Sequence, residues 1–143
     1  PQYLAEGGDP QPEAEIDLII ERLDLGNLAD ELVGSLPTGH ARLVELGRAL
    51  AARPSVLLLD EPASGLDDNE TDAFGDLLVT LAANGLGILL VEHDVALVMR
   101  VCEHLSVLDF GQIIASGSPD EVRSNEAVLS AYLGTAPVDG GAA

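Results

Sequence analysis

Two short apolar runs in this chain, 56–59 and 88–91, each end in polar side chains suited to chemistry. The residues that follow the two runs are Asp60, Glu61, Glu92, His93 and Asp94. In open parallel sheets, ligands bind beyond the carboxyl ends of the strands. If both runs are strands of one sheet, this set of carboxylates and imidazole lines a candidate ligand site. The alternative for Asp60 is a turn or helix-cap residue.

The elements around these residues predict an α/β architecture. A short apolar run bounded by Pro54 and Pro62, or preceded by Gly85 and Gly87, is typical of a fully buried strand in a parallel sheet. A helix over 68–83 separates the two strands. Its inward face is predicted to carry Phe74, Leu77, Leu78 and Leu81.

The rest of the chain supplies further elements. Apolar spacing predicts a helix from Glu13 to about Leu25, with Ile16, Ile19, Ile20 and Leu23 on one stripe. Helices are also expected over 41–53 and 95–102, with a hairpin of strands 104–109 and 112–116. Ser118, Pro119 and Glu121 form a strong helix-start pattern. Val128, Leu129, Tyr132 and Leu133 predict a last amphipathic helix.

Composition excludes several classes of function. The 143 residues hold 25 Asp and Glu against 6 basic residues, all Arg, which gives a net charge of −19. This charge argues against nucleic-acid binding and against docking on anionic lipid. Lys is absent, so no lysine of this chain takes part in catalysis or phosphate binding. The single Cys102 favours a reducing compartment, and no run approaches the ~18 apolar residues of a membrane span.

Four segments in a fixed order resemble the motifs of the ATP-binding cassette (ABC) ATPases. They are Leu36-Pro37-Thr38-Gly39-His40, Leu58-Leu59-Asp60-Glu61-Pro62, Ser64-Gly65-Leu66-Asp67 and Leu90-Val91-Glu92-His93-Asp94. The resemblance covers about residues 13–134. It implies the α/β fold of the C-terminal half of a P-loop NTPase, with a parallel-sheet core and flanking helices.

The resemblance also divides the chain into segments. Residues 1–12 are expected to be a linker or disordered start, and 13–53 the end of the helical subdomain with a signature-like motif and its helix. Residues 54–134 are expected to form the C-terminal half of the ATPase core, and 135–143 a flexible tail.

Roles for individual residues follow from the resemblance. Asp60 matches the carboxylate that holds Mg²⁺, and Glu61 matches the catalytic glutamate that orients the attacking water. His93 matches the switch histidine at the terminal phosphate, with a capping or core histidine as its alternative. Asp67 matches an aspartate at the dimer seam, and with Glu70 it also fits a helix N-cap.

The signature-like motif departs from the family pattern Leu-Ser-Gly-Gly-Gln. Pro37 stands where the serine is usual, and it lacks a backbone N–H. The resemblance implies nucleotide contacts across a dimer from Leu36, Thr38, Gly39 and His40, although His40 is equally well a plain surface residue. The following helix would direct its N-terminal N–H groups at the terminal phosphate.

A phosphate loop of the form G-x-x-x-x-G-K-[ST] is missing from the 143 residues. The chain by itself is therefore expected to bind ATP and Mg²⁺ weakly and to be inactive, whereas the intact subunit would hydrolyse ATP. The strand that ends at Asp60 is expected to expose an apolar edge, through which the fragment would self-associate.

Residues 107–122 and 127–134 are similar to the ending of ATPase subunits of branched-chain amino-acid importers. This similarity implies a second ATPase subunit and membrane permease subunits as partners, with the protein peripheral on the cytoplasmic face of the membrane. Two alternatives remain. One is a non-catalytic half-cassette used for interaction or regulation, and the other is half of a chromosome-maintenance ATPase, which the charge disfavours.

Overall fold

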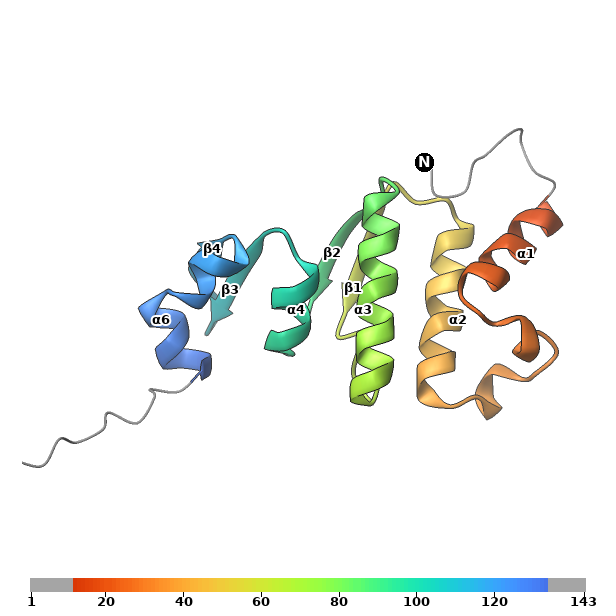
Figure 1. Ribbon diagram of the computed structural model, residues 1–143, viewed down its shortest axis with the longest axis horizontal. Helices are drawn as coiled ribbons and strands as arrows, with labels where there is room; N and C mark the ends of the chain where they lie inside the picture. The colour runs from red at the N-terminus through yellow and green to blue at the C-terminus, as the bar shows by residue number, and fades with distance from the viewer. Residues whose placement is uncertain (1–11, 134–143) are drawn as a thin grey trace, which may run out of the picture. The chain divides into compact units, whose positions relative to one another are not determined.

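The computed structural model describes residues 12–133, and the chain divides into two compact units between Leu97 and Val98 (Figure 1). The predicted tail over 135–143 lies outside the described residues. So does the predicted linker, apart from Pro12, which is the first residue of a helix. Among residues 12–133, no helix is both long and apolar enough to cross a membrane.

The first unit begins with two helices, α1 (Pro12–Arg22) and α2 (Thr38–Ala51). Short 3-10 turns at Gly26–Leu28 and Val33–Ser35 lie between them. The helices approach closely at Gly47, where an added Cβ would lie 2.9 Å from Leu23 Cδ1. Helix α2 starts three residues before its predicted beginning at Ala41, so Thr38, Gly39 and His40 of the signature-like motif lie in its first turn.

The buried row of α1 differs from the predicted stripe. Ile19 and Leu23 are buried as expected, but Ile16 is 50% exposed. Glu15 takes the inward place one helical turn before Ile19, and its carboxylate accepts hydrogen bonds from the Arg53 guanidinium, one of them 2.6 Å long. The ion pair with Arg53 offsets part of the cost of burying this carboxylate, and the apolar pattern alone does not reveal the pair.

The sheet of this unit is parallel, as predicted. Strand β1 (Val56–Asp60) leads to helix α3 (Asp68–Ala83), which leads to strand β2 (Gly87–Val91). Val56 pairs with Gly87, and Asp60 pairs with Val91, so both strands end at the same level. The predicted bounds of α3 are confirmed, and Phe74, Leu78 and Leu81 on its inward face are buried.

The prediction that both strands are fully buried is wrong for the described chain. Leu57 is buried and its neighbours Leu59, Ile88 and Leu90 pack on the same core. Leu58 and Leu89 point the other way and are 69% and 59% exposed. Side chains of a strand alternate between its faces. Only one face of this pair is covered within residues 12–133, so continuous apolar composition here does not mean burial on both sides.

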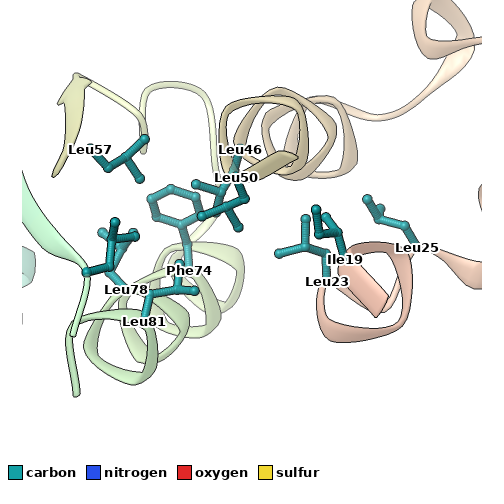
Figure 2. Close-up of a cluster of buried hydrophobic side chains, with 10 residues drawn as sticks. Ile19, Leu23, Leu25, Leu46, Leu50, Leu57, Phe74, Leu78 and Leu81 are labelled. Atoms are coloured by element: carbon teal, nitrogen blue, oxygen red, sulfur yellow. The ribbon is translucent and has the colours of Figure 1, made fainter. Parts of the chain in front are cut away.

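Side chains from α1, α2, β1 and α3 meet in one core (Figure 2). Phe74 of α3 lies among Leu46 and Leu50 of α2 and Leu57 of β1. Leu50 and Leu81 are buried almost completely. Burial of a leucine side chain contributes about 1.5–3 kcal/mol. This core therefore ties the helix of the signature-like motif to the strand that ends at Asp60.

Helix α4 (Val95–Val101) leads into the second unit, where strands β3 (Leu105–Asp109) and β4 (Gln112–Gly117) form the predicted antiparallel hairpin. Helix α5 (Pro119–Arg123) follows with the expected cap at Ser118. Burial raises the pKa of the Cys102 thiol, which packs against this unit's small core. A raised thiol pKa means less thiolate at neutral pH and a less reactive cysteine.

The last predicted helix is irregular. Helix α6 (Glu126–Val128) continues as a single π-turn, η3 (Leu129–Leu133). Val128 is buried, while Leu129 is exposed, so the expected apolar face is only partly formed. The side chains of Tyr132 and Leu133 lie outside the described residues.

Candidate functional site

The carboxyl ends of β1 and β2 bring the predicted polar residues together. Asp60 is the last residue of β1 and is exposed, and it pairs in register with Val91. Glu61 directly follows β1, and Glu92 directly follows β2. The shared edge that the sequence predicts therefore exists in the first unit, and the side chains of Asp60 and Glu61 are open to solvent.

Glu61 has an unusual backbone conformation. Its φ is +45°, in the left-handed region that residues with a Cβ seldom adopt. Its N–H donates a 2.8 Å hydrogen bond to the carbonyl of Val91, which extends the strand pairing by one residue. Strained residues of this kind persist only where surrounding contacts hold them, and they gather at functional sites.

His93 faces Glu61. Its Nδ1 lies 3.5 Å from Glu61 Oε1, and the two side chains are 72% and 56% exposed. The contact is an ion pair only when the imidazole is protonated, and exposed pairs of this kind contribute little to stability. The contact matters for the geometry of the site, because it sets a carboxylate and an imidazole side by side at the end of the sheet.

Glu92 lies deeper than the other polar residues, with only 1% of its side chain exposed. Its Oε1 accepts the N–H of Ala63 at 2.9 Å, and its Oε2 accepts the N–H of His93 at 3.1 Å. The sequence places Glu92 in the polar cluster but assigns it no role. The alternation of side chains along β2 was the signal that could have found the inward position of Glu92. Leu90 is on the core side, and Glu92 follows it by two residues.

Asp67 caps helix α3, so the N-cap interpretation of this residue is confirmed. Its side chain accepts the N–H of Glu70 at 2.8 Å, and Glu70 Oε2 accepts the N–H of Asp67 at 3.0 Å. The two reciprocal bonds form a capping box, which satisfies two of the free donors of the helix end.

The signature-like residues lie beside this capping box. An added Cβ on Gly39 would be 2.4 Å from Glu70 Oε1, and one on Gly65 would be 3.3 Å from Thr38 Cγ2. Only a glycine at position 39 leaves room for the Glu70 carboxylate where it stands. Gly65 has φ +83°, a conformation that glycine adopts without strain. Gly39 and Glu70 are far apart in sequence, and no local pattern predicts their contact.

Leu36 and His40 are the first and last residues of the signature-like motif. Leu36 is half-buried and ends the preceding 3-10 turn, with its N–H bonded to the carbonyl of Val33 at 3.2 Å. The buried Nδ1 of His40 has no hydrogen-bond partner within residues 12–133. The described contacts therefore form two groups, one around Asp60, Glu61 and His93 and one around Gly39 and Asp67.

The donor set near Asp60 fits Mg²⁺ in one limited way. Within residues 12–133, no three His, Cys, Asp or Glu side chains are placed to hold a metal ion together. Mg²⁺ is commonly bound through one or two carboxylates with water and substrate phosphates, rather than by a cage of protein ligands. The exposed Asp60 carboxylate is suited to that minimal role.

Comparison with known proteins gives the family. The ABC transporter family model matches residues 2–64, and the model for branched-chain amino acid ATP-binding cassette transporters matches residues 112–137. A high-affinity branched-chain amino acid transport ATP-binding protein of Pseudomonas aeruginosa, BraF, is 39% identical over 118 residues, covering 82% of this chain and 46% of the relative. The lipopolysaccharide export ATP-binding protein LptB of Haemophilus influenzae is 38% identical over 126 residues, covering 87% and 52%.

Solved structures agree on the fold. The ADP conformation of MJ1267, an ATP-binding cassette of an ABC transporter, matches with a TM-score of 0.79 and 32% sequence identity, over 90% of this chain and 52% of that one. The chain spans about half the length of the curated relatives that it matches. It belongs to the ABC transporter family of ATP-binding proteins, and its C-terminal region is of the branched-chain amino acid type.

Proposed function

We propose that this chain is part of an ATP-hydrolysing subunit of an ABC importer for branched-chain amino acids. The observation that carries the proposal is the pair Asp60 and Glu61 at the carboxyl end of β1, with His93 Nδ1 3.5 Å from Glu61 Oε1. The C-terminal family match over 112–137 supports amino-acid import over the lipopolysaccharide export named for LptB.

In this proposal Glu61 orients the water that attacks the terminal phosphate. Phosphoryl transfer depends mainly on positioning and on charge stabilisation. The Glu61 carboxylate is exposed, so a water molecule can reach it from solvent. The backbone that carries it is fixed by the hydrogen bond from the Glu61 N–H to Val91. His93 binds the terminal phosphate beside it. Asp60 would hold Mg²⁺, which neutralises phosphate charge when it is bound.

The second group of residues would serve a neighbouring subunit. Leu36, Thr38, Gly39 and His40 form or precede the first turn of α2, whose own residues include no acid, although the Glu70 carboxylate lies against Gly39. We infer that this turn contacts ATP held by a second ATPase subunit and that Asp67 lies at the same seam. Permease subunits in the membrane would be the other partners, with the ATPase on the cytoplasmic face.

The test is the substitution Glu61→Gln in the full-length gene product that contains these residues. Loss of the carboxylate is expected to lower kcat for ATP about 100-fold or more, because one group positions the water, while the Kd for ATP stays within about twofold of the wild-type value. Glu103→Gln, an exposed change of equal charge, is the matched control. Wild-type turnover in the Glu61→Gln protein would reject the proposed role.

The 143-residue chain by itself is proposed to be inactive. It contains no lysine and so cannot supply a phosphate-loop lysine. This feature also favours a second candidate function, a non-catalytic half-cassette that binds a protein partner. Calorimetry with ATP and Mg²⁺ on the chain distinguishes the cases, because micromolar affinity would contradict the proposed inactivity. Hydrolysis by the full-length product would reject the non-catalytic function.

A further inference from the structure

The side chain of Glu92 joins the two loops that carry the proposed catalytic residues. One carboxylate oxygen accepts the N–H of Ala63, two residues after Glu61. The other oxygen accepts the N–H of His93. A single buried group thus contacts both the loop after β1 and the loop after β2.

Burial makes these contacts specific. A carboxylate with only 1% of its side chain exposed is costly unless hydrogen bonds compensate for the lost water. Here each oxygen has a backbone donor, and His93 Nδ1 lies 3.7 Å from Oε2. Bonds from N–H groups to a carboxylate are stronger than those between neutral groups. Both loops are therefore stabilised when the Glu92 side chain stays in this one position.

The loop around Glu61 needs such fixing because its backbone is strained. Glu61 has φ +45° and is anchored on one side by its own N–H, which bonds to Val91 at 2.8 Å. The Ala63 bond to Glu92, at 2.9 Å, anchors the other side of the buried Pro62. The two anchors are the last residue of β2, Val91, and the residue that follows it, Glu92, so the geometry of Glu61 follows the position of residues 91–92.

We propose that Glu92 is a positioning residue that holds Glu61 and His93 in a fixed relation to each other. It touches neither phosphate nor the attacking water in this role. It acts by fixing the backbone on both sides of the reacting groups. The assignment deepens the proposed function and rests on it for its catalytic meaning, whereas its structural part stands on the two hydrogen bonds.

The structural part is tested by amide hydrogen exchange, read by NMR, on the 143-residue chain. The Ala63 amide is expected to be protected in the wild-type chain, although it lies outside helices and strands. In Glu92→Ala it should exchange at least tenfold faster, while the amides of β1 and β2 keep their protection. Glu103→Gln is the control. An Ala63 amide that exchanges as fast as an unstructured peptide in the wild-type chain overturns the proposal, and this measurement needs no variant.

The catalytic part is tested by steady-state kinetics on the full-length gene product with Glu92→Gln, which keeps the size of the side chain. Gln offers one acceptor oxygen for two N–H donors, so one bond is lost. We expect kcat to fall about 10- to 100-fold with little change in KM, because small misplacements of reacting groups cost up to about 100-fold. Unchanged kcat, or a change in KM alone, overturns the proposal.

The two proposals fail in distinguishable ways. If Glu61→Gln leaves turnover unchanged, the proposed function falls, but protection of the Ala63 amide still reports whether Glu92 holds the loop. If Glu61→Gln lowers turnover and Glu92→Gln does not, the proposed function stands and the positioning role falls.

Discussion

The starts of helices α3 and α5 use the same local device in two different settings. Asp67 and Glu70 form a capping box at α3, and Ser118 and Glu121 form one at α5. In each box, the glutamate accepts the N–H of the cap residue, at 3.0 Å for Asp67 and 2.8 Å for Ser118. Local sequence alone specifies both boxes.

The two capping boxes differ in what surrounds their glutamates. Glu121 packs on Gly117, the residue directly before its own cap, so the α5 box is complete within five residues of sequence. Glu70 packs on Gly39 in the first turn of α2, a distant part of the chain. The same motif is thus a simple helix start in one unit and a contact with the signature-like residues in the other.

The largest expected loss of stability is at the capping box of α5, formed by Ser118 and Glu121. In Gly117→Ala the new Cβ would lie 3.2 Å from Glu121 Cβ and 2.7 Å from Glu121 Oε2. Because Cβ of Glu121 is fixed to the helix backbone, we expect overpacking to destabilise this unit by about 1–3 kcal/mol. Native-state hydrogen exchange of residues 98–133 measures it. A stable variant would show that the hairpin and α5 are less tightly joined than the structure indicates.

Removing each cap is expected to cost less. Asp67→Ala and Ser118→Ala each delete a side-chain acceptor at a helix start, which typically costs about 1 kcal/mol. Amide exchange in the first turns of α3 and α5 reports the local loss. Because Glu70 also packs against Gly39, Asp67→Ala should in addition alter the amide shifts of residues 38–40. If those shifts do not move, the contact does not couple the two segments.

A smaller net effect is expected for Gly39→Ala. The new methyl group would displace the Glu70 carboxylate, whose flexible end can move. Alanine gains up to about 1 kcal/mol over glycine in a helix, which offsets the loss of about 1 kcal/mol for the bond to Asp67. Stability should change little, while the Asp67 amide loses protection. Retained protection would mean that Glu70 finds room for the methyl group.

The smallest effect is a pH dependence at α5. Hydrogen bonds from the Ser118 backbone N–H, and then from its hydroxyl, lower the pKa of Glu121 below its ordinary value of 4.5. A carboxylate with a lowered pKa stabilises the fold above that value and loses its contribution as the pH falls through the folded pKa. Protection of the Ser118 amide should therefore decline below pH 4.5, and Glu121→Gln should abolish this pH dependence. A wild-type response identical to that of the variant would contradict it.

Much of the local structure could be predicted from residue types. The breakers Pro54 and Gly87 bound the strands, and the apolar spacing of α3 gives its length and its buried face. The exposure of Leu58 and Leu89 could not be predicted in this way, because an apolar run carries no information about how many faces are covered. Glu15, and not the predicted Ile16, lies on the buried face of α1. This arrangement depends on the ion pair with Arg53, which is distant in sequence.

The candidate site shows the same division. Sequence alone determined the order of the motifs, the polar ends of both strands and the two helix caps, because each depends on neighbouring residues. The tertiary structure decided that Glu92 accepts the N–H of Ala63 and that Gly39 meets Glu70. Those contacts join segments about 30 residues apart, and only the packing of strands and helices on a shared core brings such segments into contact.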